Sequence, residues 1–309
     1  MKEPPTWVLL GAAALLLAGL CLAQERFGRG GQRGWRGEPT EGPIVRTEGG
    51  ELVNEDTVRT ARETASHSTG TPNWTNTPGF EDDVFTFARI IYKYDRRLVR
   101  RSSMAWINDY PDSDLNLSFR LQQLTSMKVD PNGRVLKLTN ADLFDYPFIY
   151  VVKAGRMELR DEEVPILRKY LAGGGALMAD DFWGDDDWSN FENQIRRVLP
   201  RRQWVELPMS HQIFQFPFPL KGDKNSLQVP SIHRWESSGV SYRGDEDTHE
   251  MHVRAWLDDK QRIMVIATHN TDNGDGWERE GEDEEYFHTF SEPRAYPLGI
   301  NIIFYLMTH

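Results

Sequence analysis

The sequence predicts an α/β domain built on a mainly parallel β-sheet, and three features of the chain support this class. Short, wholly apolar segments such as Ala176 to Ala179 are typical of strands that are covered on both faces. Segments with helical periodicity alternate with these strands, as in the run DEEVPILRKYLA that begins at Asp161. Units of this length connect neighbouring strands by right-handed crossovers, which make the strands parallel.

Residues 1–23 are typical of an export signal, with an apolar stretch from Trp7 to Leu20 and a cleavage site after Ala23. We therefore expect an exported protein, periplasmic or extracellular. The alternative is an uncleaved inner-membrane anchor formed by residues 7–22, because this stretch is close to the roughly 20 residues that span a bilayer. Membrane contact is expected only in that case.

Cys21 is the only cysteine of the chain, and it lies inside this first segment. A lipoprotein signal that ends at Cys21 is a further alternative, but Leu20 is bulky where such a signal needs a small residue. Cleavage after Ala23 would leave a mature chain without any thiol. Disulfides, thiolate metal ligands and cysteine nucleophiles would then all be excluded.

Residues 24–82 have the composition of a disordered linker that is rich in Gly, Arg and Thr, with RFGRGGQRGWRG at the front. Little of this stretch can bury apolar surface, so we expect the folded domain to span residues 83–309. The formal net charge is -11, from 36 Lys and Arg against 47 Asp and Glu. This balance argues against a nucleic-acid partner, because a duplex binder concentrates basic residues that displace phosphate counterions.

Aliphatic and aromatic content predicts the strands of the sheet, and turn signals such as DPNG before Val135 separate them. The expected strands are Val84–Tyr92, Val135–Leu138, Phe148–Val152, Ala176–Ala179, Trp204–Leu207 and Arg262–Ala267. Residues 211–262 carry no clear pattern and are predicted to be an insertion with some antiparallel strands.

Leucines three to four residues apart predict the first helix, in which Leu117, Leu121 and Leu124 share one face. The expected helical segments are Asp114–Thr125, a short turn at Asp142–Tyr146, the segment from Asp161 up to the glycines that begin at Gly173, Asn190–Val198 and Leu298–Met307. The last of these could also be a strand, although its apolar spacing favours a helix. The acidic run over residues 272–285 is predicted to be a solvated loop.

The segments FTFARIIY, DYPDSDLNLSFRLQQLT, LFDYPFIYVV, DEEVPILRKYLAGGGALMADDFWG and GINIIFYLMT resemble, in this order, a family known as domain of unknown function 4159. That family is similar to the class I glutamine amidotransferase-like fold, a flavodoxin-like three-layer fold shared with trehalose-utilisation proteins. The resemblance implies a bacterial envelope protein with no assigned reaction. It does not imply amidotransferase activity, because that chemistry needs a cysteine where this chain has Asp180 and Asp181.

Asp180 and Asp181 stand at the end of the apolar strand Ala176–Ala179, where open α/β sheets bind their ligands. Their carboxylates, with the three aspartates that follow Gly184, suit a hard divalent cation such as Mg²⁺ or Ca²⁺. Successive strand residues point to opposite faces, so only one of the two would face a given pocket unless the chain turns there. The alternative is that one aspartate caps the next helix and the others are solvated.

His211 and His269 each follow a predicted strand, so a parallel sheet would bring both to the same edge as Asp181. A carboxylate beside one or two imidazoles could hold a metal or form an acid and base pair for hydrolysis. The alternative for each histidine is a hydrogen-bonded loop residue.

Trp106 and Asp109 follow the first strand and are expected to rise on the same side as Trp183. Aromatic rings beside carboxylates are typical of carbohydrate sites, because the rings stack on sugar faces and the acids accept hydroxyl protons. The alternative is that these rings cover the end of the sheet.

Together these features predict an exported envelope protein that acts as a non-catalytic ligand-binding or assembly module, with an envelope protein or a carbohydrate as partner. Its ligand edge would contain Trp106, Asp109, Asp180, Asp181 and Trp183. The alternative is a hydrolase of sugars or cell-wall fragments that depends on a metal or on a carboxylate and His211 or His269. A divalent metal is the one cofactor that these residues suggest.

Overall fold

The computed structural model describes residues 43–79, 83–94 and 105–309, which belong to one compact unit, Pro39–His309. The predicted export signal over residues 1–23, the alternative anchor over residues 7–22 and the linker over residues 24–42 lie outside the described residues. Within the described part of the chain, no helix is both long enough and apolar enough to cross a membrane.

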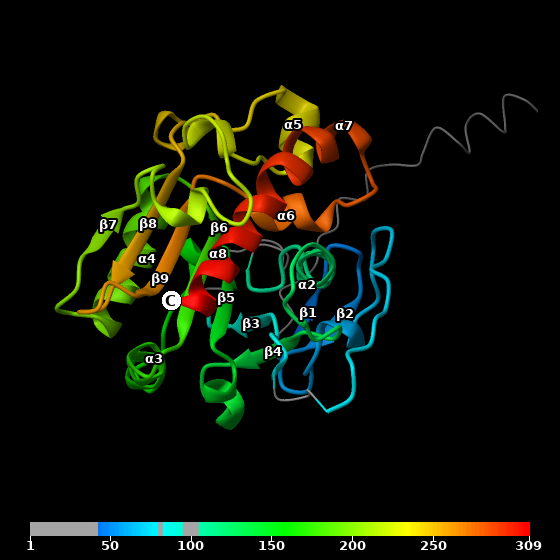
Figure 1. Cartoon of the computed structure of the whole chain (residues 1–309). Helices are drawn as coiled ribbons and strands as arrows, with labels where there is room; N and C mark the ends of the chain where they lie inside the picture. The colour runs from blue at the N-terminus through cyan, green and yellow to red at the C-terminus, as the bar shows by residue number, and fades with distance from the viewer. Residues whose placement is uncertain (1–42, 80–82, 95–104) are drawn as a thin grey trace, which may run out of the picture. The chain divides into compact units, whose positions relative to one another are not determined.

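A seven-stranded, mostly parallel sheet forms the centre of the domain (Figure 1). Its spatial order is β4-β3-β5-β6-β9-β8-β7, in which the first five strands run parallel and β8 and β7 are antiparallel to their neighbours β9 and β8. The strands are β3 (Ala88–Ile91), β4 (Arg134–Lys137), β5 (Phe148–Val152), β6 (Ala176–Phe182), β7 (Trp204–Glu206), β8 (His252–Leu257) and β9 (Ile263–His269). The predicted α/β class with a mainly parallel sheet is confirmed.

Helices cover both faces of this sheet, and each face has its own apolar core. In β5, Ile149 and Val151 belong to the core under α3 and α4, whereas Phe148, Tyr150 and Val152 belong to the core under α2, α6 and α8. This alternation explains why the strand is apolar at every position. The helices are α2 (Asp112–Leu124), α3 (Glu163–Ala172), α4 (Gly184–Val198), α5 (Ile232–Ser238), α6 (Asn273–Glu278), α7 (Glu284–Tyr286) and α8 (Tyr296–Thr308), and a π-helical segment, Phe287–Ala295, joins α7 to α8.

The central strand β6 continues three residues beyond the predicted Ala176–Ala179, so Asp180 and Asp181 lie inside the strand. Its pairing with β9 shifts register between Ala179 and Phe182, because a bulge interrupts the ladder there. Helix α4 begins at Gly184, earlier than predicted, and its first turn contains the acidic run that follows this glycine. Carboxylates at this position interact favourably with the positive end of the helix dipole.

Two predictions about segments outside the sheet are wrong. Residues 43–79 are not a disordered linker: they contain a hairpin of β1 (Ile44–Arg46) and β2 (Leu52–Asn54), and Val45 and Val53 are buried in the core. The run over residues 272–285 is not a solvated loop, because it contains α6 and α7 and buries both acidic side chains of α6. Both segments are held by ion pairs and hydrogen bonds to distant parts of the chain, which local composition does not reveal.

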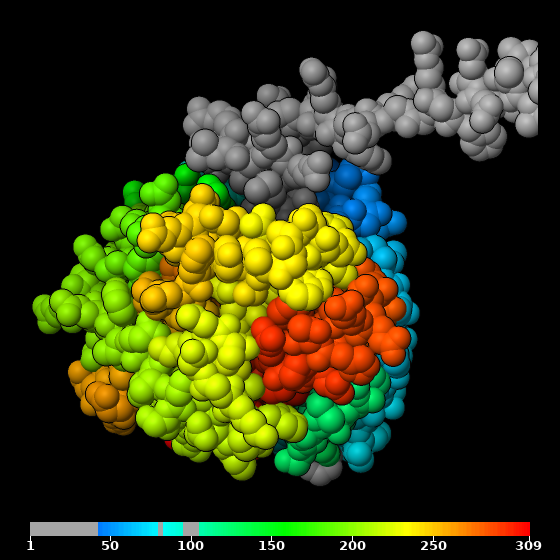
Figure 2. Space-filling view, turned by 90° about the horizontal axis from the view of Figure 1, so that it is seen from above, coloured from blue at the N-terminus to red at the C-terminus, as the bar shows by residue number. Residues whose placement is uncertain are grey.

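The insertion over residues 211–262 contains α5 and β8, and β8 adds the predicted antiparallel strand to the sheet. The part of the insertion around α5, which is yellow in Figure 2, lies beside the orange-red segment around α7. The Trp235 and Phe290 rings, 4.9 Å apart, join these two segments. The insertion also reaches the carboxyl edge of the sheet, where Gln228 Nε2 donates a hydrogen bond to Asn270 O (2.8 Å).

Candidate functional site

Unusual backbone conformations gather at the carboxyl edge of the parallel strands. Among the described residues, five non-glycine residues have positive φ, and four of them follow β3, β5 and β9 or lie at the end of β6: Asp109 (59°), Lys153 (51°), Asn270 (59°) and Asp181 (53°). Such conformations cost free energy and persist where the surrounding structure holds them, often at functional sites. These conformations therefore mark the carboxyl edge of the sheet as a candidate functional site.

Three carboxylates meet at this edge. One oxygen from each of Asp109, Asp181 and Asp272 lies within 4.8 Å of the others, and each residue is at most 1% exposed. Asp181 comes from β6, and Asp109 comes from the connection between β3 and α2. Asp272 is the residue that caps α6, and its Oδ1 accepts a hydrogen bond from Asp275 N (3.1 Å). We call these three residues the buried acid triad.

Asp181 is surrounded by donors and positive charges. Its Oδ2 forms an ion pair with Lys153 Nζ and accepts a hydrogen bond from Asn108 Nδ2 (2.9 Å). Its Oδ1 accepts hydrogen bonds from Trp183 Nε1 (3.1 Å) and from Arg243 Nη2 (3.2 Å). Asp181 therefore pairs with two basic side chains, one that follows β5 and one from the insertion.

Asp109 and Asp272 accept fewer hydrogen bonds than Asp181 does. Burial raises the pKa of both carboxyls well above the usual value, and neighbouring acidic groups add to the rise. Asp109 Oδ1 accepts a hydrogen bond from Asn108 Nδ2 (2.6 Å), but Asp109 Oδ2 is buried and accepts none. A buried carboxylate oxygen without a donor is costly unless a proton or a cation satisfies it.

The family model described as a domain of unknown function (DUF4159) matches residues 86–307. The chain belongs to this family. The matched region contains the whole seven-stranded sheet and the buried acid triad of this DUF4159 domain, whereas residues 43–79 precede it. No curated protein sequence matches the chain.

Asp180 points to other partners than Asp181, as strand alternation leads one to expect. It accepts hydrogen bonds from Tyr150 Oη (3.2 Å), Asn273 Nδ2 (2.8 Å) and Gly274 N (3.0 Å), and burial raises its pKa to about 6. Asp180 therefore fixes the start of α6 against the sheet. In this way it positions Asp272, which precedes that helix.

The two candidate histidines do not join the buried acid triad. His269 Nε2 lies 3.0 Å from Gly184 O, the ring packs on Phe182 and Trp188, and burial lowers its pKa to about 3. His211 Nδ1 accepts a hydrogen bond from Ile213 N (3.3 Å) beside the ring of Tyr305. Both side chains hold local structure in the DUF4159 domain.

The aromatic candidates are covered and offer little surface for a sugar. Trp106 is 0% exposed, packs on Tyr110 and donates from Nε1 to Glu55 Oε1 (2.7 Å). Trp183 is 7% exposed, and the guanidinium of Arg243 lies 4.8 Å from its ring centroid. The structure thus brings Asp109 and Asp181 together and leaves Trp106 in the core.

Three important members of the site were not predicted from the sequence. Lys153 directly follows the apolar run of β5, and a charged residue at the carboxyl end of a buried strand could have been predicted to lie at the ligand edge. Asp272 follows β9 by three residues and was assigned to a solvated loop. Arg243 lies in the unpatterned insertion, where nothing in the sequence pointed to Asp181.

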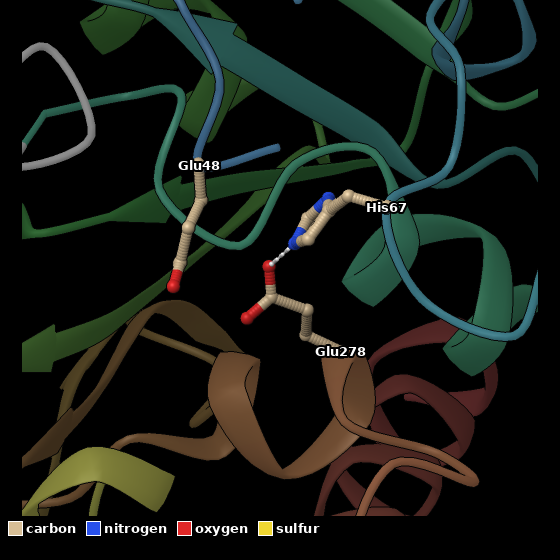
Figure 3. Close-up of side chains that lie close together, drawn as sticks. All are labelled: Glu48, His67 and Glu278. Carbon is tan, nitrogen blue, oxygen red and sulfur yellow. Dashed lines mark ion pairs between the residues drawn. The ribbon is translucent and has the colours of Figure 1, made fainter. Parts of the chain in front are cut away.

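The triad is one end of a longer row of buried acids. Asp109 also lies within 4.8 Å of oxygens from Asp275 and Glu278, and Glu278 in turn groups with Glu48 and His67. Figure 3 shows these last three side chains converging from separate segments of the chain. The row therefore extends from the sheet edge to the segment 43–79.

Proposed function

We propose that this DUF4159 domain is a non-catalytic binding module whose ligand is a hard divalent cation, Ca²⁺ or Mg²⁺, held by Asp109, Asp181 and Asp272. The observation that carries the proposal is the buried Asp109 Oδ2, which accepts no hydrogen bond beside two further carboxylates. Carboxylate oxygens are the ligands that these cations prefer. A cation would neutralise three acids that are otherwise expensive to bury together.

The dimensions of the site favour an ion over a carbohydrate. All three side chains of the triad are at most 1% exposed, and Arg243 with Trp183 covers Asp181. A sugar would need the triad to open, whereas an ion needs only an exchange of partners at Asp181. Lys153 is the partner that competes for this oxygen.

The hydrolase alternative has less support. Neither His211 nor His269 lies in the acid groups found among the described residues, so Asp181 has no imidazole partner from these two positions. Turnover of sugars or cell-wall fragments that is lost in Asp181→Ala would favour the hydrolase. Wild-type chain without turnover supports the binding module.

Calorimetric titration of the full chain, freed of metal with a chelator, tests the cation site. We expect CaCl₂ or MgCl₂ to bind the wild-type chain, and Asp109→Asn and Asp272→Asn to weaken binding by at least about tenfold, because each removes a ligand charge. Asp259→Asn is the matched control, since the side chain of Asp259 is 91% exposed and lies outside the triad. Absence of binding, or equal binding in Asp272→Asn, would overturn the proposal.

We also propose that the finer fold class is flavodoxin-like. The five parallel strands have the order second, first, third, fourth, fifth, which is the flavodoxin-like order, and the triad lies at the carboxyl edge of the sheet, where open α/β sheets bind ligands. Export and an envelope partner are proposed from residues 1–23 alone. Cell fractionation distinguishes a processed, released chain from one that stays in the inner membrane through residues 7–22.

The proposed partner can be sought by affinity capture with the full chain and with a chain that lacks residues 24–38. This deletion leaves the compact unit Pro39–His309 complete. Loss of a captured envelope protein in the shorter chain assigns the interaction to the deleted residues. Equal capture assigns it to the compact unit.

A further inference from the structure

We propose a second metal site, for Zn²⁺ or a similar borderline divalent metal, formed by Glu48, His67 and Glu278. It is distinct from the buried acid triad and does not depend on the function proposed for the triad. One ligand atom from each of the three residues lies within 4.8 Å of the others. A nitrogen donor combined with carboxylate oxygens suits Zn²⁺ better than it suits Ca²⁺ or Mg²⁺.

The three side chains come from separate elements (Figure 3). Glu48 lies in the turn between β1 and β2, His67 lies in the segment after the short helix Ala61–Glu63, and Glu278 ends α6. Glu48 and His67 precede the family-matched region, and Glu278 is inside it. A bound metal would therefore join residues 43–79 to the DUF4159 domain.

The His67 ring lies between two carboxylates, with one ring nitrogen close to each. Its Nδ1 lies 2.9 Å from Asp112 Oδ2, and Asp112 is itself fixed by Ser66 Oγ (2.5 Å) and by His67 N (3.0 Å), which both donate to it. The opposite nitrogen, Nε2, faces Glu278 Oε1 at 2.6 Å. Metal-binding histidines commonly donate their second nitrogen to a carboxylate, which fixes both the tautomer and the ring direction.

Glu278 is a buried carboxylate that is held by ion pairs and not by hydrogen bonds. Its side chain is 0% exposed, and neither oxygen accepts a hydrogen bond. Its described contacts are the ion-pair distances to His67 Nε2 and to Arg279 Nε (3.0 Å). A buried carboxylate needs a positive partner, and a metal would take this role from a protonated His67.

Solvent reaches two of the three proposed ligands. A surface cavity of about 670 Å³ is lined by Glu48 and His67, among others, whereas Glu278 is buried behind them, so a metal would enter past Glu48 and His67 and could keep a water ligand on the cavity side. Zinc bonds of about 2.0–2.2 Å in a tetrahedral site separate ligand atoms by roughly 3.3 Å. His67 Nε2 and Glu278 Oε1 would have to move apart by roughly 0.7 Å, a shift within the reach of side-chain rotation.

Arg279 is the group that opposes a metal at this place. Its Nη2 donates to Glu48 Oε1 (2.7 Å), so the metal must share Glu48 with the guanidinium. The charge of Arg279 is offset by Glu282 Oε2, 3.2 Å from Nη1, and by Asp275 Oδ1, 3.5 Å from Nε. Arg279 thus has four carboxyl groups around it, those of Glu48, Asp275, Glu278 and Glu282. These acids outnumber the single guanidinium, which favours a further cation at this place.

Zinc binding to the metal-free full chain, measured in competition with a chromophoric chelator, tests this site. We expect one Zn²⁺ per chain at the site and at least about a tenfold loss of affinity in His67→Gln. His288→Gln is the control, because His288 has a side chain that is 58% exposed and pairs with Glu292 instead. Asp272→Asn should leave zinc affinity unchanged while it weakens Ca²⁺ or Mg²⁺ binding, which separates this site from the triad.

A second variant and a spectroscopic measurement guard against misfolding of the histidine variant. Glu48 is partly exposed, so Glu48→Gln should fold and should still lose zinc affinity. Co²⁺ in place of Zn²⁺ should give the intense visible absorption of a four-coordinate site in the wild-type chain and lose it in both variants. Absence of zinc binding, or equal binding in His67→Gln and Glu48→Gln, would overturn the proposal.

Discussion

Lys153 and Asp181 form an ion pair although both residues have a left-handed backbone, with φ of 51° and 53°. Asp181 lies in β6, and Lys153 directly follows the neighbouring parallel strand β5, so the two side chains meet at the carboxyl edge of the sheet. The Lys153 side chain is 14% exposed and that of Asp181 is 0% exposed, so water screens the pair weakly. Burial opposes the charge on Lys153, but Asp181 outweighs it and raises the pKa of Lys153.

Replacing Lys153 with Met should therefore destabilise the metal-free chain. Loss of one partner from a buried ion pair typically costs about 3 kcal/mol, and Arg243 remains to satisfy part of the Asp181 charge. Because Lys153 competes with the proposed cation, Lys153→Met should also bind Ca²⁺ or Mg²⁺ more tightly. Urea denaturation with chelator and with CaCl₂ should show a loss of stability that the cation reduces.

The control for this change is Lys93→Met, because Lys93 is half exposed in its pair with Glu158. Exposed pairs contribute about 0–1 kcal/mol, so the control should differ little from wild type in either condition. A Lys153→Met chain with unchanged stability and unchanged cation affinity would show that the ion pair does not restrain Asp181.

Gly274→Ala should disturb the triad through a direct clash with Asp109. A Cβ at position 274 would lie 2.3 Å from Asp109 Oδ2 and 3.2 Å from Tyr150 Oη. We expect a loss of about 1–3 kcal/mol in the free energy of unfolding, as is usual when a well-packed site receives an extra carbon.

The double variant Gly274→Ala/Asp109→Ala provides the control, because the second change removes the oxygen that the new methyl group meets. Gly274→Ala should then cost less in the Asp109→Ala background than in wild type, with a coupling of about 1 kcal/mol or more from urea denaturation. Additive effects would mean that the clash is relieved elsewhere.

The fold could be predicted from the sequence because its strands are short, apolar and covered on both faces. Phe148–Val152 was predicted with the bounds that the structure shows, and Ala176–Ala179 was predicted as the interior strand that it is. In each case the signal is local: every residue of the strand must be apolar when both faces are buried. Asp180 and Asp181 were found by the same reasoning, since they directly follow the apolar part of this strand.

The rest of the site depends on contacts between residues that are far apart in the sequence. The acidic composition of α6 suggested a solvated loop. In the structure, Arg279 and His67 pair with Glu278, and Asn116 Nδ2 donates a hydrogen bond to Trp277 O of the same helix. His67 comes from a segment whose composition suggested a linker, and Arg243 comes from an insertion without periodicity. Composition and spacing report local preference, so they do not show which distant cation will neutralise a given carboxylate.

Arg89 positions the triad from β3, and Arg89→Lys should weaken both the fold and the site. The guanidinium is 0% exposed, pairs with Asp114, and donates from Nη1 to Trp106 O and Asn108 O (2.8 Å each). These bonds hold the connection that presents Asn108 and Asp109. A lysine keeps the charge but cannot reproduce the planar set of donors.

We expect Arg89→Lys to lower the free energy of unfolding by about 2–4 kcal/mol, since hydrogen bonds to charged groups contribute about 1.5–3 kcal/mol each. Calorimetry should show weaker Ca²⁺ or Mg²⁺ binding at temperatures where the chain is still folded. Arg196→Lys, at an exposed helical pair with Glu192, is the control and should be close to neutral. Full cation affinity in Arg89→Lys would mean that Asp109 is positioned without this network.

His269 should make the domain sensitive to acid between pH 6.5 and pH 3. Burial lowers the pKa of its ring to about 3, from an ordinary value of 6.5. Below pH 6.5 the unfolded chain binds a proton that the folded chain does not, so the contribution of neutral His269 is lost as the pH falls towards 3. At pH 5 this amounts to about 2 kcal/mol, because each pH unit is equivalent to about 1.4 kcal/mol.

Urea denaturation at pH 7 and at pH 5 tests this prediction. The fall in the free energy of unfolding between the two pH values should be smaller in His269→Gln than in wild type, even if the two chains differ in stability at pH 7. Other groups titrate in the same range, but they are common to both chains and cancel in the comparison. His288→Gln should keep the wild-type difference, because His288 is exposed and bonded to Glu292. An equal pH dependence in His269→Gln and wild type would mean that the folded chain protonates His269 as readily as the unfolded chain does.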